Sequence, residues 1–480
     1  MHPDHRQRSE QTALTVFSRA PESGARIHML GIGGVGMAGL ALLIKSLGWQ
    51  VDGCDASTGP LLSWLNAQGI ATKVGHAPAH LNERPVAIVR SPAVAWTDPE
   101  LVAALEQQIP VIDRGRLLPA LLGARSTVAV AGTHGKTTTA SMIAWCLARA
   151  GHPVSYCIGG VCPGLDAVAR IEPEGWVVVE ADESDGTLRH YHPKVGVVTA
   201  LDLDHVDYYA DESALHSVYH TFVRQSDLAI VPAGSCGESG WPGTRVITFG
   251  EATASVQAAH CRLDAGGSDL EVAIEGGAII PVRLGVPGRH NILNALAAWA
   301  ALRACGLPAQ DIAAGLSTFR LPRRRFETVI DAAGIRIISD YAHHPVEIKA
   351  LIDQAKLLAP RRLIAVFQPH RYSRTRAFSS AFINVLAELD LVVLAPVYSA
   401  SEPFIEGGTS ADVHAEAVRR GCTRIHLADS LDEAWIRLRR AMQPGDLVLI
   451  IGAGDVDRIG PWAANHVLSC ATTINKETNV

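Results

Sequence analysis

Short apolar runs rich in Val and Ile alternate with longer, Ala- and Leu-rich amphipathic stretches over almost all of the 480-residue chain. Continuous apolar runs of this kind are typical of parallel strands, which helices bury on both faces of a sheet. At roughly 100–200 residues per domain, the length corresponds to about three domains. The alternation therefore predicts an α/β protein with three domains.

The strand–helix pattern restarts twice, and the restarts set the expected domain limits. A first series opens with a strand at Arg26, a second with a strand at Thr127, and a third follows 321-LPRRRFE-327. The expected domains are residues 24–121, 122–325 and 326–466. Residues 1–23 and about 467–480 are expected to be mobile tails.

The central series contains a stretch of a different kind. Between Arg245 and Arg283, polar and apolar residues alternate around glycine-rich turns. Alternation with period two indicates antiparallel strands rather than buried parallel ones. We therefore expect a mixed sheet in the central domain.

Composition excludes several classes of partner. A formal net charge of −6 gives the chain no global attraction for nucleic acid or anionic lipid. No apolar run approaches the roughly 18–20 residues of a membrane span, and the polar opening segment predicts no signal peptide. Nine scattered cysteines without a CxxC pair indicate free thiols in a reducing compartment. We expect a cytoplasmic protein without nucleic-acid or membrane partners.

The strongest local motif is 127-TVAVAGTHGKTTTASMIAWCLARAG-151, a buried strand, a tight glycine turn and an amphipathic helix. Backbone N–H groups of such a turn, with the helix N-terminus, bind phosphate oxygens. Lys136 is placed to contact the β- and γ-phosphates, and Thr137 to offer a hydroxyl to Mg²⁺. Val130 stands where the strict Walker A spacing has glycine, so the motif is a variant. The segment predicts an ATP site formed by Gly132, Thr133, His134, Gly135, Lys136, Thr137 and Thr138.

Two further expected strands end in polar side chains. The segment 176-WVVVEADESDG-186 delivers acids, Glu180 first, to the carboxyl end of a strand, where ligands of open α/β sheets bind. Carboxylates beside a nucleotide commonly hold Mg²⁺, and we favour that role over a solvated loop. His205 follows another expected strand in 199-TALDLDHVDYY-209. We favour a metal or phosphate contact for it over a packed histidine.

A second glycine turn, 31-GIGGVG-36, lies between a strand and a helix near the N-terminus, and Asp55 closes the next strand. The pattern predicts a diphosphate on the helix N-terminus, with the acid on a ribose hydroxyl. A UDP-sugar satisfies that geometry as well as NAD does. The turn alone leaves both ligands open.

Eight short segments, spread over the chain in a fixed order, together form a recognisable pattern. They are 27-IHMLGIGGVGMAG-39, 131-AGTHGKTTT-139, 180-EADESDG-186, 204-DHVDYY-209, 287-PGRHNILNALAA-298, 323-RRRFE-327, 339-SDYAHHPVEI-348 and 368-QPHRYSRTR-376. In this order they resemble the Mur ligase family, and the resemblance spans nearly the whole chain. It implies an N-terminal Rossmann-like domain for a UDP moiety, a central P-loop ATPase with a mixed sheet, and a C-terminal Rossmann-like domain that brings an amino acid.

The resemblance also implies an activity, ATP-dependent amide formation in peptidoglycan precursor synthesis, by a monomer or homodimer. In the most similar branch, L-alanine is joined to the lactoyl carboxylate of UDP-N-acetylmuramate through an acyl phosphate, releasing ADP and phosphate. Branches that add later residues carry a carbamylated lysine after the strand-end histidine, and no lysine lies between His205 and Arg325 here. The alternative is a recycling ligase that attaches a murein peptide to the same nucleotide, although 180-EADESDG-186 resembles the L-alanine branch more.

Carried over residue by residue, the resemblance implies catalytic roles for Lys136, Glu180 and His205. Thr137 and Glu180 would hold one Mg²⁺, and His205 a second. The residues implied to contact ATP beyond the phosphate loop are Asn291, Asn294, Arg325 and Asp340. Those implied to contact the UDP substrate are Gly33, Gly34, Val35, Gly36, Asp55 and Ser91. Those implied to contact the amino acid are Tyr341, His343, His370, Arg371 and Arg374.

The chain departs from the family pattern at Ala200, where asparagine is usual, and at Arg90, where a small residue is usual. Two other functions are alternatives to the ligase. A nicotinamide-dependent oxidoreductase leaves the phosphate loop and the acidic strand end unexplained. A catalytically inactive nucleotide-binding scaffold has only Ala200 in its favour. We therefore expect a ligase.

Overall fold

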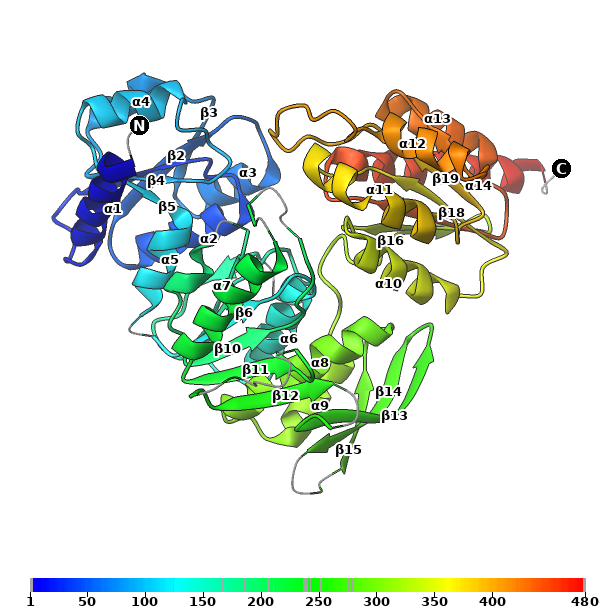
Figure 1. The fold of residues 1–480 in the computed structure, drawn as a ribbon, viewed down its shortest axis with the longest axis horizontal. Coiled ribbons are helices and arrows are strands. Elements are labelled where there is room, and N and C mark those ends of the chain that lie inside the picture. Colours follow the sequence, from blue (N-terminus) through cyan, green and yellow to red (C-terminus); the bar gives the residue numbers. More distant parts are fainter. Residues whose placement is uncertain are drawn as a thin grey trace.

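The computed structural model describes residues 3–477 apart from 124, 166, 185, 205–207, 210, 236–240, 242, 251–252, 275–276 and 278. Within these residues the chain forms three β-sheets, of five, ten and six strands. Figure 1 shows them as three lobes, blue for the N-terminal, green for the central and yellow to red for the C-terminal sheet. The predicted three-domain α/β fold is confirmed.

The N-terminal sheet is parallel, with strand order β3-β2-β1-β4-β5. Its strands are β1 (Arg26–Leu30), β2 (Gln50–Asp55), β3 (Ala71–Val74), β4 (Ala87–Arg90) and β5 (Val111–Asp113). Its helices are α2 (Val35–Ser46), α3 (Pro60–Ala67), the 3₁₀ helix η1 (Pro78–Glu83), α4 (Pro99–Glu106) and α5 (Arg114–Leu122). The strand order reverses between β1 and β4, and ligands of such sheets bind at that switch point, outside the carboxyl ends of the strands.

The N-terminus differs from the prediction of a mobile tail. Residues Pro3–Phe17 form helix α1, which packs against this sheet, with Ala13 fully buried. Arg6 donates to Asp113 at 2.8 Å, and Arg116 of α5 donates to Glu10 at 2.9 Å. A polar segment is ordered here because its charges find partners on α5 and at the end of β5.

The central sheet has the order β15-β14-β13-β12-β11-β10-β6-β9-β7-β8. Its strands are β6 (Thr127–Ala131), β7 (Val154–Cys157), β8 (Ala169–Arg170), β9 (Trp176–Glu180), β10 (Val195–Val198), β11 (Leu228–Pro232), β12 (Val246–Gly250), β13 (Val256–Asp264), β14 (Gly267–Ile274) and β15 (Ile279–Leu284). Its helices are α6 (Lys136–Arg149), η2 (Thr187–His190), α7 (Glu212–Gln225), α8 (Arg289–Ala304) and α9 (Ala309–Thr318). Strands β13 to β15 pair antiparallel, which confirms the predicted mixed sheet.

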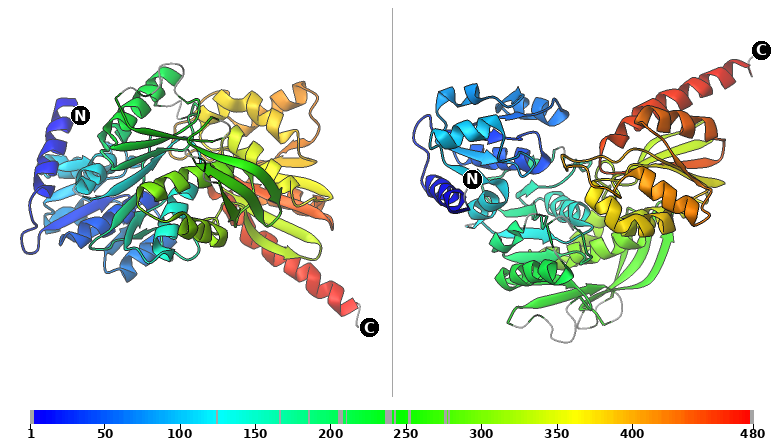
Figure 2. Two further views of the ribbon diagram at one scale, coloured as in Figure 1. Left: turned by 90° about the horizontal axis from the view of Figure 1, so that it is seen from below. Right: turned by 45° about the horizontal axis from the view of Figure 1, so that its top comes forward.

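The C-terminal sheet has the order β16-β17-β21-β18-β19-β20, parallel except for the edge strand β16. Its strands are β16 (Glu327–Ala332), β17 (Ile335–Asp340), β18 (Arg362–Phe367), β19 (Leu391–Leu394), β20 (Ile425–Leu427) and β21 (Asp446–Ile451). Its helices are α10 (Pro345–Lys356), α11 (Tyr372–Leu386), α12 (Ser410–Arg419), α13 (Leu431–Ala441), η3 (Asp455–Arg458) and α14 (Ile459–Glu477). Where a tail was expected from about 467, α14 continues as a helix that leaves the lobe (Figure 2).

The hydrophobic cores join the first two lobes and leave the third separate. One cluster of buried apolar side chains runs from the N-terminal sheet into the central sheet, whereas the clusters of the C-terminal lobe contain residues of that lobe alone. Where the N-terminal and central lobes meet, Gly39 of α2 lies so close to Cys157 of β7 that a methyl group added to the glycine would overlap the cysteine sulfur. None of the described helices has the length and apolar character that a membrane crossing requires.

Candidate active site

The phosphate loop lies at the carboxyl end of β6, between β9 and β10, and opens α6. Gly135 caps the helix with φ of +80°, and a side chain there would collide with Asn294 of α8. Only glycine fits this backbone conformation beside so close a neighbour. The glycine thus begins α6 directly after the turn, and a helix N-terminus of this kind offers N–H groups for an anion.

Lys136 lies inside the turn rather than on its rim. Its Nζ donates to the carbonyl of Gly132 at 2.7 Å and to both carboxylate oxygens of Glu183 at 2.7 and 2.9 Å. Burial alone would lower the pKa of Lys136, but the charge of Glu183, helped by Asp182 and Glu180, outweighs it and raises the pKa. The turn thus holds a permanent cation, whose carboxylate partner a phosphate would have to displace.

Hard oxygen donors converge beside the lysine. Thr137 donates its hydroxyl to Glu180 Oε2 at 2.9 Å, and the N–H of Gly159 donates to the same oxygen at 2.8 Å. A side chain on Gly159 would lie 2.6 Å from Glu180 Oε2 and 2.8 Å from Thr137 Oγ1, so the space against these oxygens is kept free by the glycine. Hydroxyl and carboxylate oxygens are the ligands that Mg²⁺ takes, so the donor set fits that ion.

The segment after β10 supports the loop through its backbone. The N–H of Thr133 donates to the carbonyl of Ala200 at 3.0 Å, and the Thr133 hydroxyl donates to the carbonyl of Asp202 at 2.9 Å. Ala200 takes part through an atom that every residue has, so its departure from the family pattern leaves this contact intact. His205, a predicted catalytic residue and metal ligand, lies outside the described residues.

A cavity of about 270 Å³ lies beside the loop, between the central and C-terminal lobes. Seven predicted ATP residues line it: His134, Gly135, Thr138, Asn291, Asn294, Arg325 and Asp340. Its apolar side, from Leu321, Phe326, Val346 and Leu351, was not foreseen. The apolar side could pack against a planar apolar group. The other predicted loop residues do not line the cavity; they are Gly132, Thr133, Lys136 and Thr137, adjacent in the chain to the lining residues His134, Gly135 and Thr138.

Asp340 ends β17 at the cavity wall. Its two oxygens accept the N–H groups of Phe326 at 2.7 Å and Ala342 at 2.8 Å. Burial raises its pKa, against the opposing effect of Arg325. Those two backbone contacts fix the carboxylate while leaving lone pairs for a hydroxyl donor.

A polar contact between the central and C-terminal lobes joins the phosphate loop to α10. His134 Nδ1 lies 3.1 Å from Glu347 Oε1. Glu347 Oε2 accepts the N–H of His343 at 3.0 Å and caps α10 by accepting the N–H of its N-cap residue, His344, at 3.3 Å. Burial disfavours the charged form of Glu347, but His343, His134 and Arg325 outweigh it and hold its pKa well below its usual range. The glutamate, which the sequence did not single out, ties the phosphate loop to the C-terminal lobe.

The residues predicted for the amino acid gather on the C-terminal lobe. The His343 ring lies 5.5 Å from that of Tyr341 and 5.7 Å from that of His370, and Arg374 Nη1 lies 3.2 Å from His370 Nδ1. Burial lowers the pKa of His343 to about 4 and that of His370 to about 3, so both rings are neutral. Arg371 opens α11 as its N-cap residue.

Arg374 has a partner that the sequence did not predict. Its Nε and Nη2 donate to the two oxygens of Asp204 at 3.0 Å each, and both side chains are 5% exposed. A buried bidentate pair of this kind is strong because each carboxylate oxygen receives a charge-assisted hydrogen bond. It joins the C-terminal lobe to the segment directly before His205. The predicted contact of Arg374 with an amino-acid carboxylate stays a prediction.

The predicted UDP residues meet at the carboxyl ends of β1, β2 and β4. Gly33 donates its N–H to Asp55 Oδ2 at 2.9 Å, Ser91 packs against Gly31, and Gly34, Val35 and Gly36 open α2. Arg114, which the sequence analysis missed, places its guanidinium against Gly36, where an added side chain would have to displace it, and its Nη2 donates to Asp182 Oδ2 at 3.3 Å. The arginine therefore places a cation at the first glycine turn and links it to the acidic strand end of the second.

Arg90 turns away from this site. It donates from Nε to Asp113 Oδ1 at 2.6 Å and stacks over the Trp96 ring at 4.4 Å, beside Arg6 of α1. It is 5% exposed. The arginine at this unusual position serves packing against α1 and leaves the UDP turn unobstructed.

Comparison with known proteins gives a consistent family. Residues 26–126 match the Mur ligase family catalytic domain, residues 130–302 the Mur ligase middle domain, and residues 324–454 the Mur ligase glutamate ligase domain. The UDP-N-acetylmuramate–L-alanine ligase of Kineococcus radiotolerans is 42% identical over 456 residues, which cover 92% of this chain and 96% of that one. The enzyme of the same name from Nitratidesulfovibrio vulgaris is 38% identical, over 90% and 97% of the two chains.

Solved structures agree with the sequence matches. The crystal structure of UDP-N-acetylmuramate–alanine ligase from Thermotoga maritima superposes with a TM-score of 0.79 at 26% identity, covering 93% of this chain and 99% of that one. A murein peptide ligase from Psychrobacter arcticus superposes with a TM-score of 0.72, also at 26% identity and with the same coverage of both chains.

Proposed function

The chain belongs to the Mur ligase family, and we propose that it joins L-alanine to the lactoyl carboxylate of UDP-N-acetylmuramate, consuming ATP and releasing ADP and phosphate. It is an ATP-dependent ligase of peptidoglycan precursor synthesis. The observation that carries the proposal is the meeting of two anion-binding turns through the contact of Arg114 with Asp182. Such a meeting suits a reaction that brings a nucleotide-linked carboxylate against a triphosphate.

Each lobe has one substrate in this proposal. Residues 24–121 bind the UDP moiety at the first glycine turn, residues 122–325 bind ATP, and residues 326–466 bring the amino acid. The three matched family segments, 26–126, 130–302 and 324–454, follow similar limits and support the division. The cavity between the second and third lobes supports an ATP site that both lobes complete.

In the first step a lactoyl carboxylate oxygen attacks the γ-phosphorus of ATP, and the bond to ADP breaks. Lys136 moves from Glu183 to the transferring phosphoryl group, while the α6 N-terminus holds its oxygens. Thr137 and Glu180 would hold Mg²⁺, with His205 at a second ion. Bound Mg²⁺ supplies charge neutralisation between two anions that otherwise repel each other.

In the second step the amino group of L-alanine attacks the acyl carbon. A C–N bond forms through a tetrahedral intermediate, phosphate leaves with the C–O electron pair, and the amine loses its proton. Tyr341, His343, His370, Arg371 and Arg374 position the amino acid. Closure of the C-terminal lobe through the Arg374–Asp204 and His134–Glu347 contacts keeps water from the acyl phosphate. Positioning and electrostatics do most of this work.

Phosphate release, measured with each component omitted in turn, tests the proposal. We expect release only when ATP, Mg²⁺, UDP-N-acetylmuramate and L-alanine are all present. Binding of ATP without turnover in the complete mixture would indicate an inactive scaffold. Turnover with an L-alanyl tripeptide but not with free L-alanine would identify the recycling ligase instead. An absorbance change of added nicotinamide cofactor without ATP would identify an oxidoreductase.

We further propose that the protein acts in the cytoplasm as a monomer or homodimer. The net charge of −6 and the nature of a nucleotide-linked substrate support this setting. Sedimentation of the purified chain at several concentrations measures the oligomeric state, and cell fractionation measures the location.

A further inference from the structure

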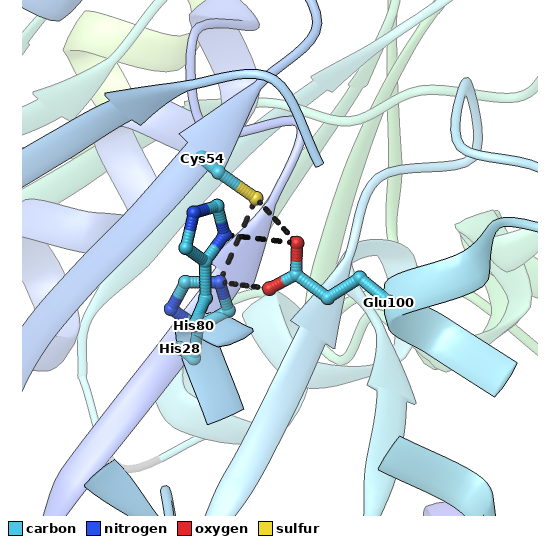
Figure 3. A group of neighbouring side chains, drawn as sticks. All are labelled: His28, Cys54, His80 and Glu100. Atoms are coloured by element: carbon cyan, nitrogen blue, oxygen red, sulfur yellow. Dashed lines mark hydrogen bonds and ion pairs between the residues drawn. The ribbon is translucent and has the colours of Figure 1, made fainter. Parts of the chain in front are cut away.

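Four side chains with metal-binding chemistry meet in the N-terminal lobe, and none of them is among the residues predicted to contact a substrate. They are His28 of β1, Cys54 of β2, His80 of η1 and Glu100 of α4, and Figure 3 shows the Glu100 carboxylate facing the sulfur and both imidazoles. Cys54 and Glu100 are fully buried, and His28 is 1% exposed. The ligase mechanism uses none of them.

The donor atoms are already close to the spacing of a tetrahedral site. One ligand atom from each residue lies within 4.8 Å of all the others. Cys54 Sγ lies 3.6 Å from His28 Nε2 and 3.2 Å from Glu100 Oε2, and His80 Nδ1 lies 3.0 Å from the same oxygen. Zn²⁺ binds at about 2.0–2.3 Å from N, O and S, so neighbouring ligands of one ion lie about 3.3–3.7 Å apart. A shift of about an ångström in each side chain closes the shell.

The environment of His28 is that of a metal ligand. Its Nδ1 lies 2.6 Å from Asp52 Oδ1, which fixes the ring and directs Nε2 into the cluster. A carboxylate on the outer nitrogen is the usual support of a zinc-bound histidine. Glu100 has equivalent support, since Ala77 donates its N–H to Oε2 at 2.8 Å.

One oxygen of the cluster has a single polar contact. Within the described residues, Glu100 Oε1 is buried and is paired with His28 Nε2 alone, at 2.8 Å. A metal ion bound by both residues would take the place of that contact and keep the buried carboxylate paired.

We propose that His28, Cys54, His80 and Glu100 bind one Zn²⁺ ion in a closed, structural site. Binding forms bonds from zinc to two imidazole nitrogens, one sulfur and one carboxylate oxygen. The Cys54 thiol proton and the proton between His28 Nε2 and Glu100 leave to solvent. Thiolate and carboxylate then carry two negative charges that balance the ion. Imidazole and thiolate select zinc over the Mg²⁺ of the ATP site, and four protein ligands leave no position for substrate.

The site would join η1 and α4 to the ends of β1 and β2. Cys54 directly precedes Asp55, whose carboxylate holds the N–H of Gly33 in the UDP turn. A metal at Cys54 would thus fix the strand end from which that turn is supported. This role is independent of the ligase proposal, because the ion can be measured in the absence of every substrate.

Metal content tests the inference directly. Tag-free full-length protein is purified, loaded with a small excess of Zn²⁺, separated from free metal and analysed by mass spectrometry of zinc. We expect about one zinc per chain in the wild type and a loss of that ion in Cys54→Ser. The matched control is Cys146→Ser, because Cys146 is equally buried but lies in α6. Equal zinc in the wild type and Cys54→Ser, or none in the wild type, would overturn the inference.

Two measurements keep the test decisive should Cys54→Ser fail to fold. Cobalt bound to the wild type should give a thiolate-to-metal absorption band and the intense visible bands of tetrahedral Co²⁺; their absence would overturn the inference. Asp52→Asn keeps all four ligands and removes the support of His28, so zinc affinity in competition with a chelator should fall about 10–100-fold. Unchanged affinity would contradict the assigned role of Asp52 and of His28.

Discussion

The chain has two glycine turns that share one backbone plan and differ in the charges set against them. In both, a buried parallel strand ends in glycines that open a helix, at β1–α2 and at β6–α6. The first turn contains no charged residue, takes a carboxylate from Asp55 onto one of its N–H groups, and receives its cation, Arg114, from another helix. The second contains its own Lys136, held by Glu183.

The comparison shows that the backbone determines where an anion can bind, whereas the neighbouring charged side chains determine what happens to it. The backbone plan provides N–H groups and a helix dipole for phosphate in both turns. A lysine that can leave its carboxylate suits a phosphoryl group that changes charge during reaction. An arginine fixed between two lobes suits a diphosphate that is only held. We therefore expect the first turn to serve binding and the second to serve transfer, and we expect that each can be disrupted separately.

The largest effect is expected from Lys136→Ala. Loss of the cation that follows the migrating phosphoryl group should lower kcat by about 10²–10³-fold. Binding of UDP-N-acetylmuramate, measured by calorimetry, should change less than about twofold because that ligand lies at the other turn. Comparable loss of both would mean that the two turns do not have separate ligands.

Arg114→Ala removes the cation at the first turn and tests whether that turn binds the UDP substrate. A charge-assisted contact is worth about 1.5–3 kcal/mol, so the UDP substrate should bind about 10–100-fold more weakly while ATP affinity stays the same. Arg116→Ala is the control, because Arg116 lies on the same helix but pairs with Glu10 of α1. Equal weakening by both substitutions would indicate damage to α5 rather than a role at the turn.

A methyl group added to each turn gives a smaller contrast. In Gly135→Ala the positive φ and the collision with Asn294 should lower stability by about 1–2 kcal/mol and weaken ATP binding. Gly34 has φ of −70°, and the nearest atom to an added methyl would be 3.6 Å away. Gly34→Ala should therefore stay within about 0.5 kcal/mol of the wild type in urea unfolding. A reversed order would contradict the described backbone of the turns.

The smallest expected effect is a pH dependence of the melting temperature. It comes from His134 of the second turn, whereas the first turn, 31-GIGGVG-36, contains no ionisable side chain. Burial disfavours charged His134, but Glu347, with Asp202 and Asp204, outweighs it and raises its pKa, against His344 nearby. A raised pKa gives stabilisation that is complete below the usual value and disappears as the pH rises through the raised one. His134→Asn should therefore lower Tm more at about pH 6 than at about pH 8.5, on either side of the usual histidine value. An equal loss at both would mean that the charge of His134 does not change between these two pH values, against the expected dependence.

The sequence predicted the elements well where burial is symmetrical. Strands β1 and β6 begin at the predicted residues, Arg26 and Thr127, because a strand covered on both faces is a continuous apolar run in the sequence. The antiparallel strands of the central sheet were recognised by their alternation. Of the residues expected at ATP, those from Gly132 to Thr138 lie together because a turn and a helix N-terminus form a local motif. Asn291, Asn294, Arg325 and Asp340 come from distant segments and were expected only from the family resemblance.

Contacts between distant segments could not be predicted in this way. Arg374 and Asp204 are 170 positions apart, and Arg114 reaches a turn formed by another part of its lobe. Neither pairing has a periodic signal, because a charged side chain looks the same in sequence whether water or a partner surrounds it. Helix α1 was missed for the same reason. The partners of its Arg6 and Glu10 are Asp113 and Arg116, which lie more than a hundred positions away.

The continuous core beneath Gly39 has a mechanical consequence. Two lobes that share packed side chains, with a helix backbone pressed on a cysteine, resist hinging at that contact because a packed interior deforms little. Under the proposed function, they would hold the sugar-linked acid and the triphosphate at a constant separation. Within the described residues, the third lobe has core clusters of its own, and its Arg374–Asp204 and His134–Glu347 contacts can break and re-form. We therefore expect the third lobe to be the part that moves and delivers the amine. We expect a compound bound between the second and third lobes to inhibit the enzyme without competing for the UDP site.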